Sequence, residues 1–226
     1  MLVLFAAGCG GGGQLTVYAA SSLTDAFQQL EPKAKFNFAG SDELAEQIRE
    51  GGRADVYASA SPKYTQALFR AHLVEQPRTF ATNRLVVIVP RSNPGNIRRV
   101  RDLARPGLRL VLGAPGVPVG DYARAALRQL GLAAALRNVV SEEQDVKGVV
   151  AKVALAEADA GVVYVTDVRT AAAKVRALPI PQAAQARYEI AVVAGTKHER
   201  DAEAFVARVL APHGRRVLRT AGFGPP

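Results

Sequence analysis

Two adjacent serines, Ser21 and Ser22, stand where an apolar run over residues 15–20 passes into a helical pattern. Ser22 and Asp25 form the S-x-x-D pattern that is typical of a helix start. Such a junction presents unpaired backbone N–H groups, the positive end of a helix dipole and hydroxyl donors. This set of neutral donors suits the binding of a small anion without any charged side chain.

Three further junctions and one tyrosine offer similar donors. The junctions lie at Ser41 with Asp42, Val119 with Gly120, and Asp145 with Val146, and Tyr164 lies near the end of an apolar run. None of them brings a lysine, arginine or histidine into the immediate motif. They favour capture of a small dianion, since a hydrogen bond to a charged group contributes roughly 1.5–3 kcal/mol. Taken singly, Ser22 and Ser41 could be plain helix caps, Val119 with Gly120 an ordinary turn, and Tyr164 a core aromatic. Spacing alone leaves these interpretations and the anion site open.

Alternation of strands and helices predicts an α/β fold with parallel sheets, which would position these junctions. Strands are predicted at residues 15–20, 33–38, 55–60, 84–90, 108–113, 138–141, 160–166, 175–180 and 188–194. This number of strands fits two small sheets better than one. We therefore expect two lobes, with residues 15–87 plus 191–226 in lobe I and residues 88–190 in lobe II. A chain that crosses twice between lobes places its ligand in the cleft between them.

The composition is that of an ordinary globular protein, with 49% hydrophobic and 22% charged residues. The net charge of +9 indicates a basic surface. Binding of nucleic acid has little support, because the chain has no zinc-finger spacing, no RNP-like aromatic motif and only 6% aromatic residues. The sequence contains no run of about 20 apolar residues, so it predicts no membrane-spanning helix.

Cys9 is the one cysteine, which excludes an intramolecular disulfide and a cysteine metal cluster. It follows an apolar run and small residues and precedes four glycines, a pattern that resembles the end of a bacterial lipoprotein signal. We expect residues 1–14 to be a signal remnant and a glycine-rich tether, with Cys9 as the lipidation site. The short apolar run and the missing basic residues after Met1 favour a start codon further upstream. A frayed terminus with a free thiol is the alternative.

Several segments, taken together, resemble the molybdate-binding proteins of bacterial ABC importers. They are residues 17–24 (VYAASSLT), 40–48 (GSDELAEQI), 51–60 (GGRADVYASA), 117–123 (VPVGDYA), 145–148 (DVKG) and 161–164 (GVVY). The resemblance covers about residues 15–224 in the family's order. It implies the two-lobed type II periplasmic-binding-protein fold, with a molybdate or tungstate ion in the cleft. Both ions are tetrahedral dianions of nearly equal size and remain alternatives.

The resemblance also implies the contacts of this oxyanion. Ser22 and Ser41 would donate hydroxyl and backbone N–H groups, Val119 and Val146 backbone N–H groups, and Tyr164 its hydroxyl. The metal would enter as the oxyanion, without direct protein ligands, and no catalytic residue or cofactor is expected. The implied partner is the membrane permease of an ABC importer, and the implied location is periplasmic or at the cell surface, as a monomer held by a lipid at Cys9.

Three other interpretations have less support. An enzyme is not indicated, because His72, His198 and His213 lie far apart and no nucleophile-elbow, Walker A or G-x-G-x-x-G motif occurs. An effector-sensing domain of a transcription regulator would need a helix-turn-helix segment, and none precedes residue 15. Binding of sulfate or another small anion by the same fold is the remaining alternative. An organic-acid ligand would call for an arginine at a cleft junction, and the five positions include none.

Overall fold

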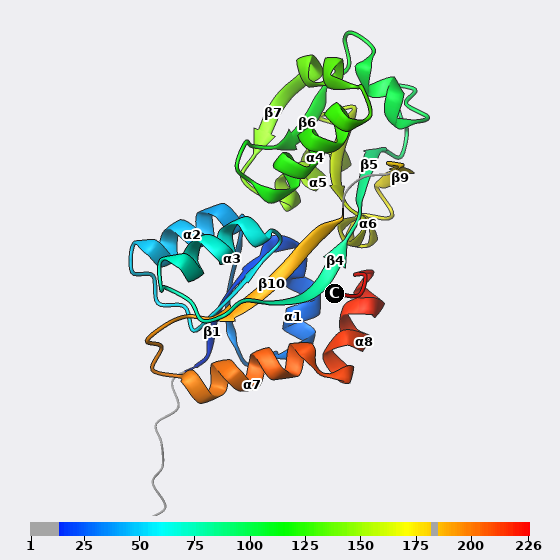
Figure 1. The fold of residues 1–226 in the computed structure, drawn as a ribbon. Coiled ribbons are helices and arrows are strands. Elements are labelled where there is room, and N and C mark those ends of the chain that lie inside the picture. The colour runs from blue at the N-terminus through cyan, green and yellow to red at the C-terminus, as the bar shows by residue number, and fades with distance from the viewer. Residues whose placement is uncertain (1–13, 182–184) are drawn as a thin grey trace, which may run out of the picture.

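The computed structural model describes residues 14–181 and 185–226 and shows two α/β lobes joined end to end (Figure 1). Residues 1–13, which include Cys9 and nearly all of the expected tether, lie outside the described residues. Within the described ranges, no helix combines the length and the apolar character needed to cross a membrane.

Lobe I is built on a five-stranded sheet in the order β2-β1-β3-β10-β4. Its strands are β1 (Thr16–Ala20), β2 (Lys35–Ala39), β3 (Val56–Ser59), β4 (Arg78–Asn83) and β10 (Ala186–Val192). Its helices are η1 (Ser21–Leu23), α1 (Thr24–Leu30), α2 (Ser41–Arg49), α3 (Pro62–Arg70), α7 (Glu199–Leu210) and α8 (Pro212–Ala221). β1 runs parallel to β2 and β3, whereas β10 runs antiparallel to β3 and β4.

Alternating side chains along the strands of lobe I bury two layers, one on each face of the sheet. Val17 faces the layer of α1, α7 and α8, where Phe27 packs edge-on against Phe205 with ring centroids 5.3 Å apart. Tyr57 faces the other layer, which α2 and α3 cover and to which Leu44 of α2 contributes. Figure 1 shows α2 and α3 on one side of the sheet and α1 and α8 on the other.

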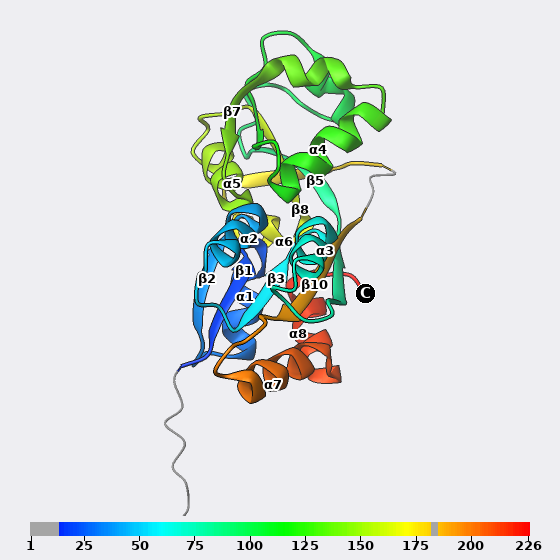
Figure 2. The ribbon, with the colours of Figure 1, turned by 60° about the vertical axis from the view of Figure 1, so that its left-hand side comes forward.

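Lobe II is built on a second five-stranded sheet in the order β7-β6-β8-β5-β9. Its strands are β5 (Leu85–Pro90), β6 (Leu110–Gly113), β7 (Val139–Glu143), β8 (Ala160–Tyr164) and β9 (Val175–Pro179). Its helices are η2 (Val100–Ala104), α4 (Pro118–Gln129), η3 (Ala133–Asn138), α5 (Val146–Ala154) and α6 (Val165–Thr170). Figure 2 shows α4 and α5 on the side of this lobe that faces α2 and α3.

The chain crosses between the lobes twice, at Arg84 and between β9 and β10. The expected lobe boundaries at 87/88 and 190/191 are therefore wrong by several residues. β5 pairs with β8 and β9 from its first residues onward, and β10 pairs with β4 from Ala186 onward. The strongest apolar runs mark the interiors of these strands, and the crossings precede them.

The expectation of parallel sheets is right for β1, β2 and β3 and for β6, β7 and β8, and wrong for the strands at the crossings. β5 is antiparallel to β8 and β9, and β10 is antiparallel to both of its neighbours. A continuous apolar run such as residues 85–90 indicates only that both faces of a strand are covered. Its direction depends on the connections, and here β5 and β10 each enter their sheet from the other lobe.

Candidate functional site

A small cavity lies between the lobes, where strand ends of both sheets meet. Lobe I lines it with Ala20, Ser21, Ser22, Ala39, Gly40, Ser41 and Ala60, and lobe II lines it with Val117, Pro118, Val119, Asp145, Val146 and Tyr164. The structure thus brings all five residues singled out in the sequence to one cavity. Three of them come from lobe II and two from lobe I.

Helix starts supply the backbone donors of this cavity. Ser22 is the second residue of η1, and Ser41 is the first residue of α2. Val119 is the second residue of α4, and Val146 is the first residue of α5. Amides in the first turn of a helix have no intrahelical carbonyl partner and carry the positive end of the dipole. The four N–H groups are therefore free to bind an anion.

The junction predicted at Val119 lies within the first turn of α4. Pro118 occupies the first helical position, where its missing N–H costs nothing and its fixed φ suits the helix. Gly120 then packs against the end of β6, and a Cβ on it would lie 2.2 Å from the carbonyl oxygen of Gly113. This close approach seats α4 directly above its strand and aims its first amides at the cavity.

The hydroxyl of Ser41 is oriented by the neighbouring strand end. Its Oγ accepts a hydrogen bond from the backbone N–H of Ala60 at 3.0 Å. The buried hydroxyl of Tyr57 donates to the carbonyl oxygen of Ser41 at 2.6 Å and holds the start of α2 in place. Because Ser41 Oγ already accepts, its own proton is available to a ligand in the cavity.

Ser22 has a partner that sequence reasoning missed. Its Oγ lies 2.8 Å from the hydroxyl of Tyr188, and both side chains are buried. Tyr188 is 166 residues away in the chain, on β10. No local motif marks it, because in the sequence it is one apolar residue of a predicted core strand.

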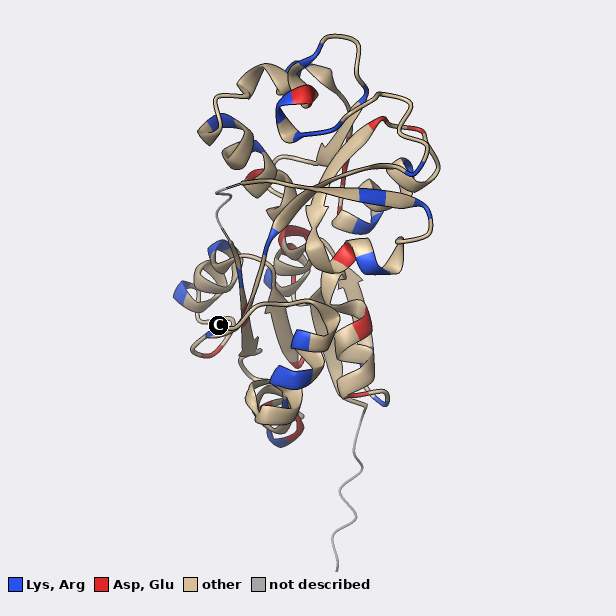
Figure 3. Ribbon diagram, turned by 90° about the vertical axis from the view of Figure 1, so that its right-hand side faces the viewer, with Lys and Arg blue, Asp and Glu red and all other residues tan. Residues whose placement is uncertain are grey.

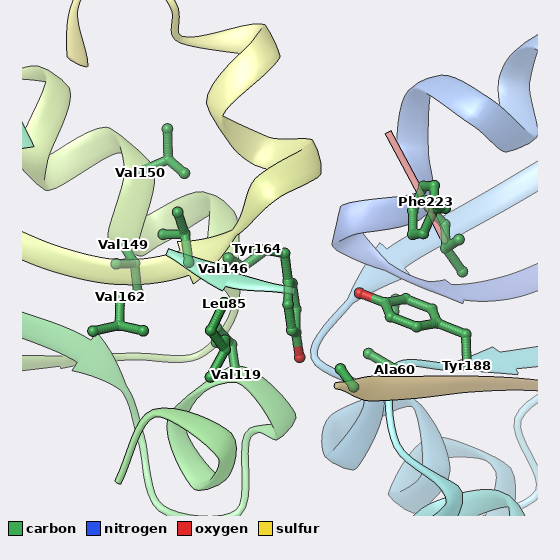
Figure 4. Packing of buried hydrophobic residues seen from close by; sticks show 14 of the residues in the cluster. Ala60, Leu85, Val119, Val146, Val149, Val150, Val162, Tyr164, Tyr188 and Phe223 are labelled. Atoms are coloured by element: carbon green, nitrogen blue, oxygen red, sulfur yellow. The ribbon is translucent and has the colours of Figure 1, made fainter. Parts of the chain in front are cut away.

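Tyr164 closes the cavity from lobe II. Its hydroxyl is buried and has no hydrogen-bond partner within the described part of the chain. Burial raises the pKa of Tyr164 well above its ordinary value, so the phenol stays protonated and remains a donor. Figure 4 shows Tyr164 and Tyr188 facing each other from opposite lobes, and their ring centroids are 5.9 Å apart.

Asp167, in the first turn of α6, is a second residue that the sequence did not single out. Its side chain is buried, its Oδ2 accepts from the backbone N–H of Tyr164 at 3.2 Å, and its Oδ1 has no partner among the described residues. Burial raises its pKa to about 7 from the ordinary 3.8. Asp167 therefore fixes the backbone of Tyr164 and titrates near neutral pH.

Neutral groups dominate the cavity lining. Asp145 is the single charged residue among those that line it, and its carboxylate caps α5 by accepting from the backbone N–H of Gly148 at 2.9 Å. No lysine, arginine or histidine lines the cavity, and Figure 3 shows the basic residues spread over the outer elements of both lobes. Among the described residues, no group of three or more His, Cys, Asp or Glu side chains is placed to hold a metal ion. The site can bind an anion through hydrogen bonds alone.

Comparison with known proteins agrees with this geometry. Residues 15–224 match the family described as bacterial extracellular solute-binding protein. The chain belongs to this family. It is 40% identical to the molybdate-binding protein ModA of Mycobacterium tuberculosis (strain ATCC 25618 / H37Rv) over 96% of this chain and 86% of that protein. It is 31% identical to ModA of Escherichia coli (strain K12) over 93% of this chain and 89% of that protein. The resemblance inferred from the sequence motifs is confirmed.

Solved structures establish the fold of this solute-binding protein. The periplasmic molybdate-binding protein of Azotobacter vinelandii superposes with a TM-score of 0.84 at 22% identity, over 94% of this chain and all of that chain. The sulfate-binding protein SubI of Mycobacterium tuberculosis H37Rv gives a TM-score of 0.80 at 17% identity, over 95% of this chain and 87% of that chain. The predicted two-lobed type II fold is confirmed.

Contacts across the cleft hold the two lobes of the solute-binding protein together. Lys63 on α3 forms an ion pair with Asp121 on α4, with Nζ and Oδ2 3.2 Å apart. The hydroxyl of Tyr64 donates to the carbonyl oxygen of Gly116. Gly40 approaches lobe II so closely that a Cβ on it would lie 2.5 Å from the carbonyl oxygen of Gln144. The two lobes thus contact each other through α3 and α4 and through Gly40.

Proposed function

We propose that this chain captures molybdate, or tungstate, outside the cytoplasm and delivers it to an ABC importer. The observation that carries the proposal is the convergence of neutral donors from both lobes on one small cavity that no basic side chain lines. The relatives named molybdate-binding protein ModA support the choice of ligand over the sulfate alternative.

Each of the five residues has a role that its place in the fold supports. Ser22 and Ser41 donate hydroxyl and backbone N–H groups, Val119 and Val146 donate backbone N–H groups, and Tyr164 donates its hydroxyl. A hydrogen bond to a charged group contributes roughly 1.5–3 kcal/mol, so several of them offset the cost of dehydrating a dianion. Because the lobes close around the ion, these donors are dry and already oriented.

Binding and release then suffice for function, with no covalent step and no cofactor. Closing of the lobes presents a joint surface of both lobes to the membrane permease that receives the ion. A lipid on Cys9, followed by the glycines of residues 10–13, would tether a monomer near that permease. The residues of this tether precede the described part of the chain.

Titration calorimetry and thermal denaturation with sodium molybdate, tungstate, sulfate and phosphate test the proposal. A ligand that binds only the folded protein raises the melting temperature by mass action. We expect molybdate and tungstate to raise it strongly and sulfate and phosphate to raise it little at equal concentration. A purified protein that responds to none of these ions, or to sulfate more than to molybdate, would refute the assignment.

A further inference from the structure

A chain of buried polar side chains runs from Asn83 through Tyr188 to Ser22, which is one of the five proposed contact residues. Asn83 is the last residue of β4 before the first crossing, Tyr188 lies on β10 and Ser22 lies on η1. Their exposed fractions are 1%, 0% and 9%. Three elements that are far apart in sequence thus meet behind one cavity hydroxyl.

The amide of Asn83 can adopt only one orientation. Its Oδ1 accepts from the backbone N–H of Arg84 at 2.9 Å, which places the NH₂ group on the opposite side. There Nδ2 lies 2.9 Å from Oγ1 of Thr166 and 3.4 Å from the hydroxyl of Tyr188. An amide NH₂ can only donate, so the oxygen of Tyr188 accepts from Asn83.

This direction passes on to Ser22. With Asn83 as one donor to the Tyr188 oxygen, the single proton of Tyr188 can be donated to Ser22 Oγ, 2.8 Å away. Ser22 Oγ then acts as the acceptor in that bond, and its own proton is free to point into the cavity. In the reverse arrangement, Ser22 would donate to Tyr188 and turn its lone pairs toward the cavity, where they would repel an anion.

We infer that Asn83 and Tyr188 are positioning residues that hold the hydroxyl of Ser22 as a donor to the bound oxyanion. This inference rests on the proposed function, because it assigns the orientation of one of its donors. It also has a consequence for specificity. A hydroxyl that only donates to its ligand cannot accept a hydrogen bond from a protonated oxyanion. It therefore favours fully ionised oxyanions over those that carry a proton, such as hydrogen phosphate.

Tyr188→Phe removes the hydroxyl of Tyr188 and leaves its packing unchanged. The ring makes edge-on contacts with Phe80, Tyr164 and Phe223, at centroid distances of 6.1, 5.9 and 5.3 Å. Figure 4 shows Tyr188 beside both Tyr164 and Phe223. The variant retains these contacts, so it isolates the effect of the hydrogen bond.

A double-mutant cycle measured by calorimetry with sodium molybdate tests the inference. We expect Ser22→Ala to weaken binding roughly 10- to 100-fold and Tyr188→Phe to weaken it roughly 3- to 10-fold. Because Tyr188 acts through the Ser22 hydroxyl, adding Tyr188→Phe to Ser22→Ala should change the dissociation constant by less than about twofold. Asn83→Ala should likewise weaken binding when the Ser22 hydroxyl is present and have little effect in Ser22→Ala. It provides a second variant if Tyr188→Phe folds poorly.

A second measurement separates positioning from a merely structural role. In Tyr188→Phe, the freed Ser22 hydroxyl can rotate and accept, so the ratio of phosphate affinity to molybdate affinity should rise. A structural defect would weaken both ligands in proportion. An equal loss of molybdate affinity from Tyr188→Phe in the presence and absence of the Ser22 hydroxyl, or an unchanged ratio, overturns the inference and leaves the proposed function intact. A wild-type protein that binds neither molybdate nor tungstate overturns both.

Discussion

Replacing Tyr164 with phenylalanine should separate ligand binding from folding stability. The hydroxyl of Tyr164 is buried without a hydrogen-bond partner in the described part of the chain. A buried polar group that lacks a partner costs about 1–3 kcal/mol. Tyr164→Phe removes that group and retains the ring, so the free energy of unfolding of the ligand-free protein should stay the same or rise by about 1 kcal/mol.

Ligand affinity should change in the opposite direction. With the oxyanion bound, the hydroxyl of Tyr164 would donate to a charged oxygen, a bond that contributes roughly 1.5–3 kcal/mol. Its loss corresponds to a dissociation constant that is roughly 10- to 150-fold larger. Burial keeps the pKa of this phenol well above its ordinary value, so it stays protonated and can donate near neutral pH.

Urea denaturation without ligand and calorimetry with sodium molybdate measure the two effects. Tyr57→Phe serves as the matched comparison, because the hydroxyl of Tyr57 is also buried but donates to the carbonyl oxygen of Ser41 at 2.6 Å. That variant should lower the free energy of unfolding by about 1 kcal/mol. If Tyr164→Phe destabilises the ligand-free protein as much as Tyr57→Phe does and leaves molybdate affinity unchanged, the assignment of Tyr164 to the ligand is wrong.

Three further changes test other parts of the site. Val146→Pro removes one N–H at the first position of α5, where proline fits, and should bind molybdate about tenfold more weakly in calorimetry than Val146→Ala, which keeps that N–H; equal affinities would exclude the amide as a ligand. Gly40→Ala places a Cβ 2.5 Å from the carbonyl oxygen of Gln144 in lobe II, so it should weaken molybdate binding. It should also reduce any decrease in the radius of gyration that X-ray scattering records on addition of molybdate. A decrease equal to that of the wild-type protein would contradict the close approach. Asp167 has a folded-state pKa of about 7 against 3.8 when exposed, so the stability that its protonation contributes is fully present below about pH 4 and is lost as the pH rises through about 7. Asp167→Asn should therefore reduce the loss of unfolding free energy between about pH 5 and about pH 8 by about 2 kcal/mol in urea titrations, and an unchanged loss would refute the burial argument.

Local signals in the sequence located several helix starts at the cavity, because helix starts are encoded locally, and the family resemblance singled out the five contact residues. Ser41 and Asp145 stand directly before apolar helical patterns, and the structure begins α2 and α5 at Ser41 and Val146. Strand ends and helix starts in α/β lobes meet at one edge of each sheet. Predicting each junction therefore also predicted where the junctions would gather, once the two-lobed fold was inferred.

Partners that are distant in the chain could not be predicted in this way. Tyr188 and Asn83 are ordinary residues of two strands, and their importance arises from pairing across β10 and β4. β4 itself was missed, because residues 78–83 mix polar and apolar side chains along an edge of the sheet. The helix α8 was also not predicted, since it is rich in arginine and begins at Pro212, directly after α7.

The chain is strongly basic, with 29 lysines and arginines against 20 acidic residues, and yet none of these basic side chains lines the cavity. A cation in the cavity would attract any anion, and its contribution would fall with ionic strength where solvent reaches it. Oriented N–H and O–H groups discriminate by the number and direction of acceptor oxygens, which a tetrahedral dianion satisfies and a planar carboxylate does not. Because two of the five proposed contacts belong to lobe I and three to lobe II, neither lobe alone offers the full set. Recognition of the ion therefore requires contacts from both lobes at once.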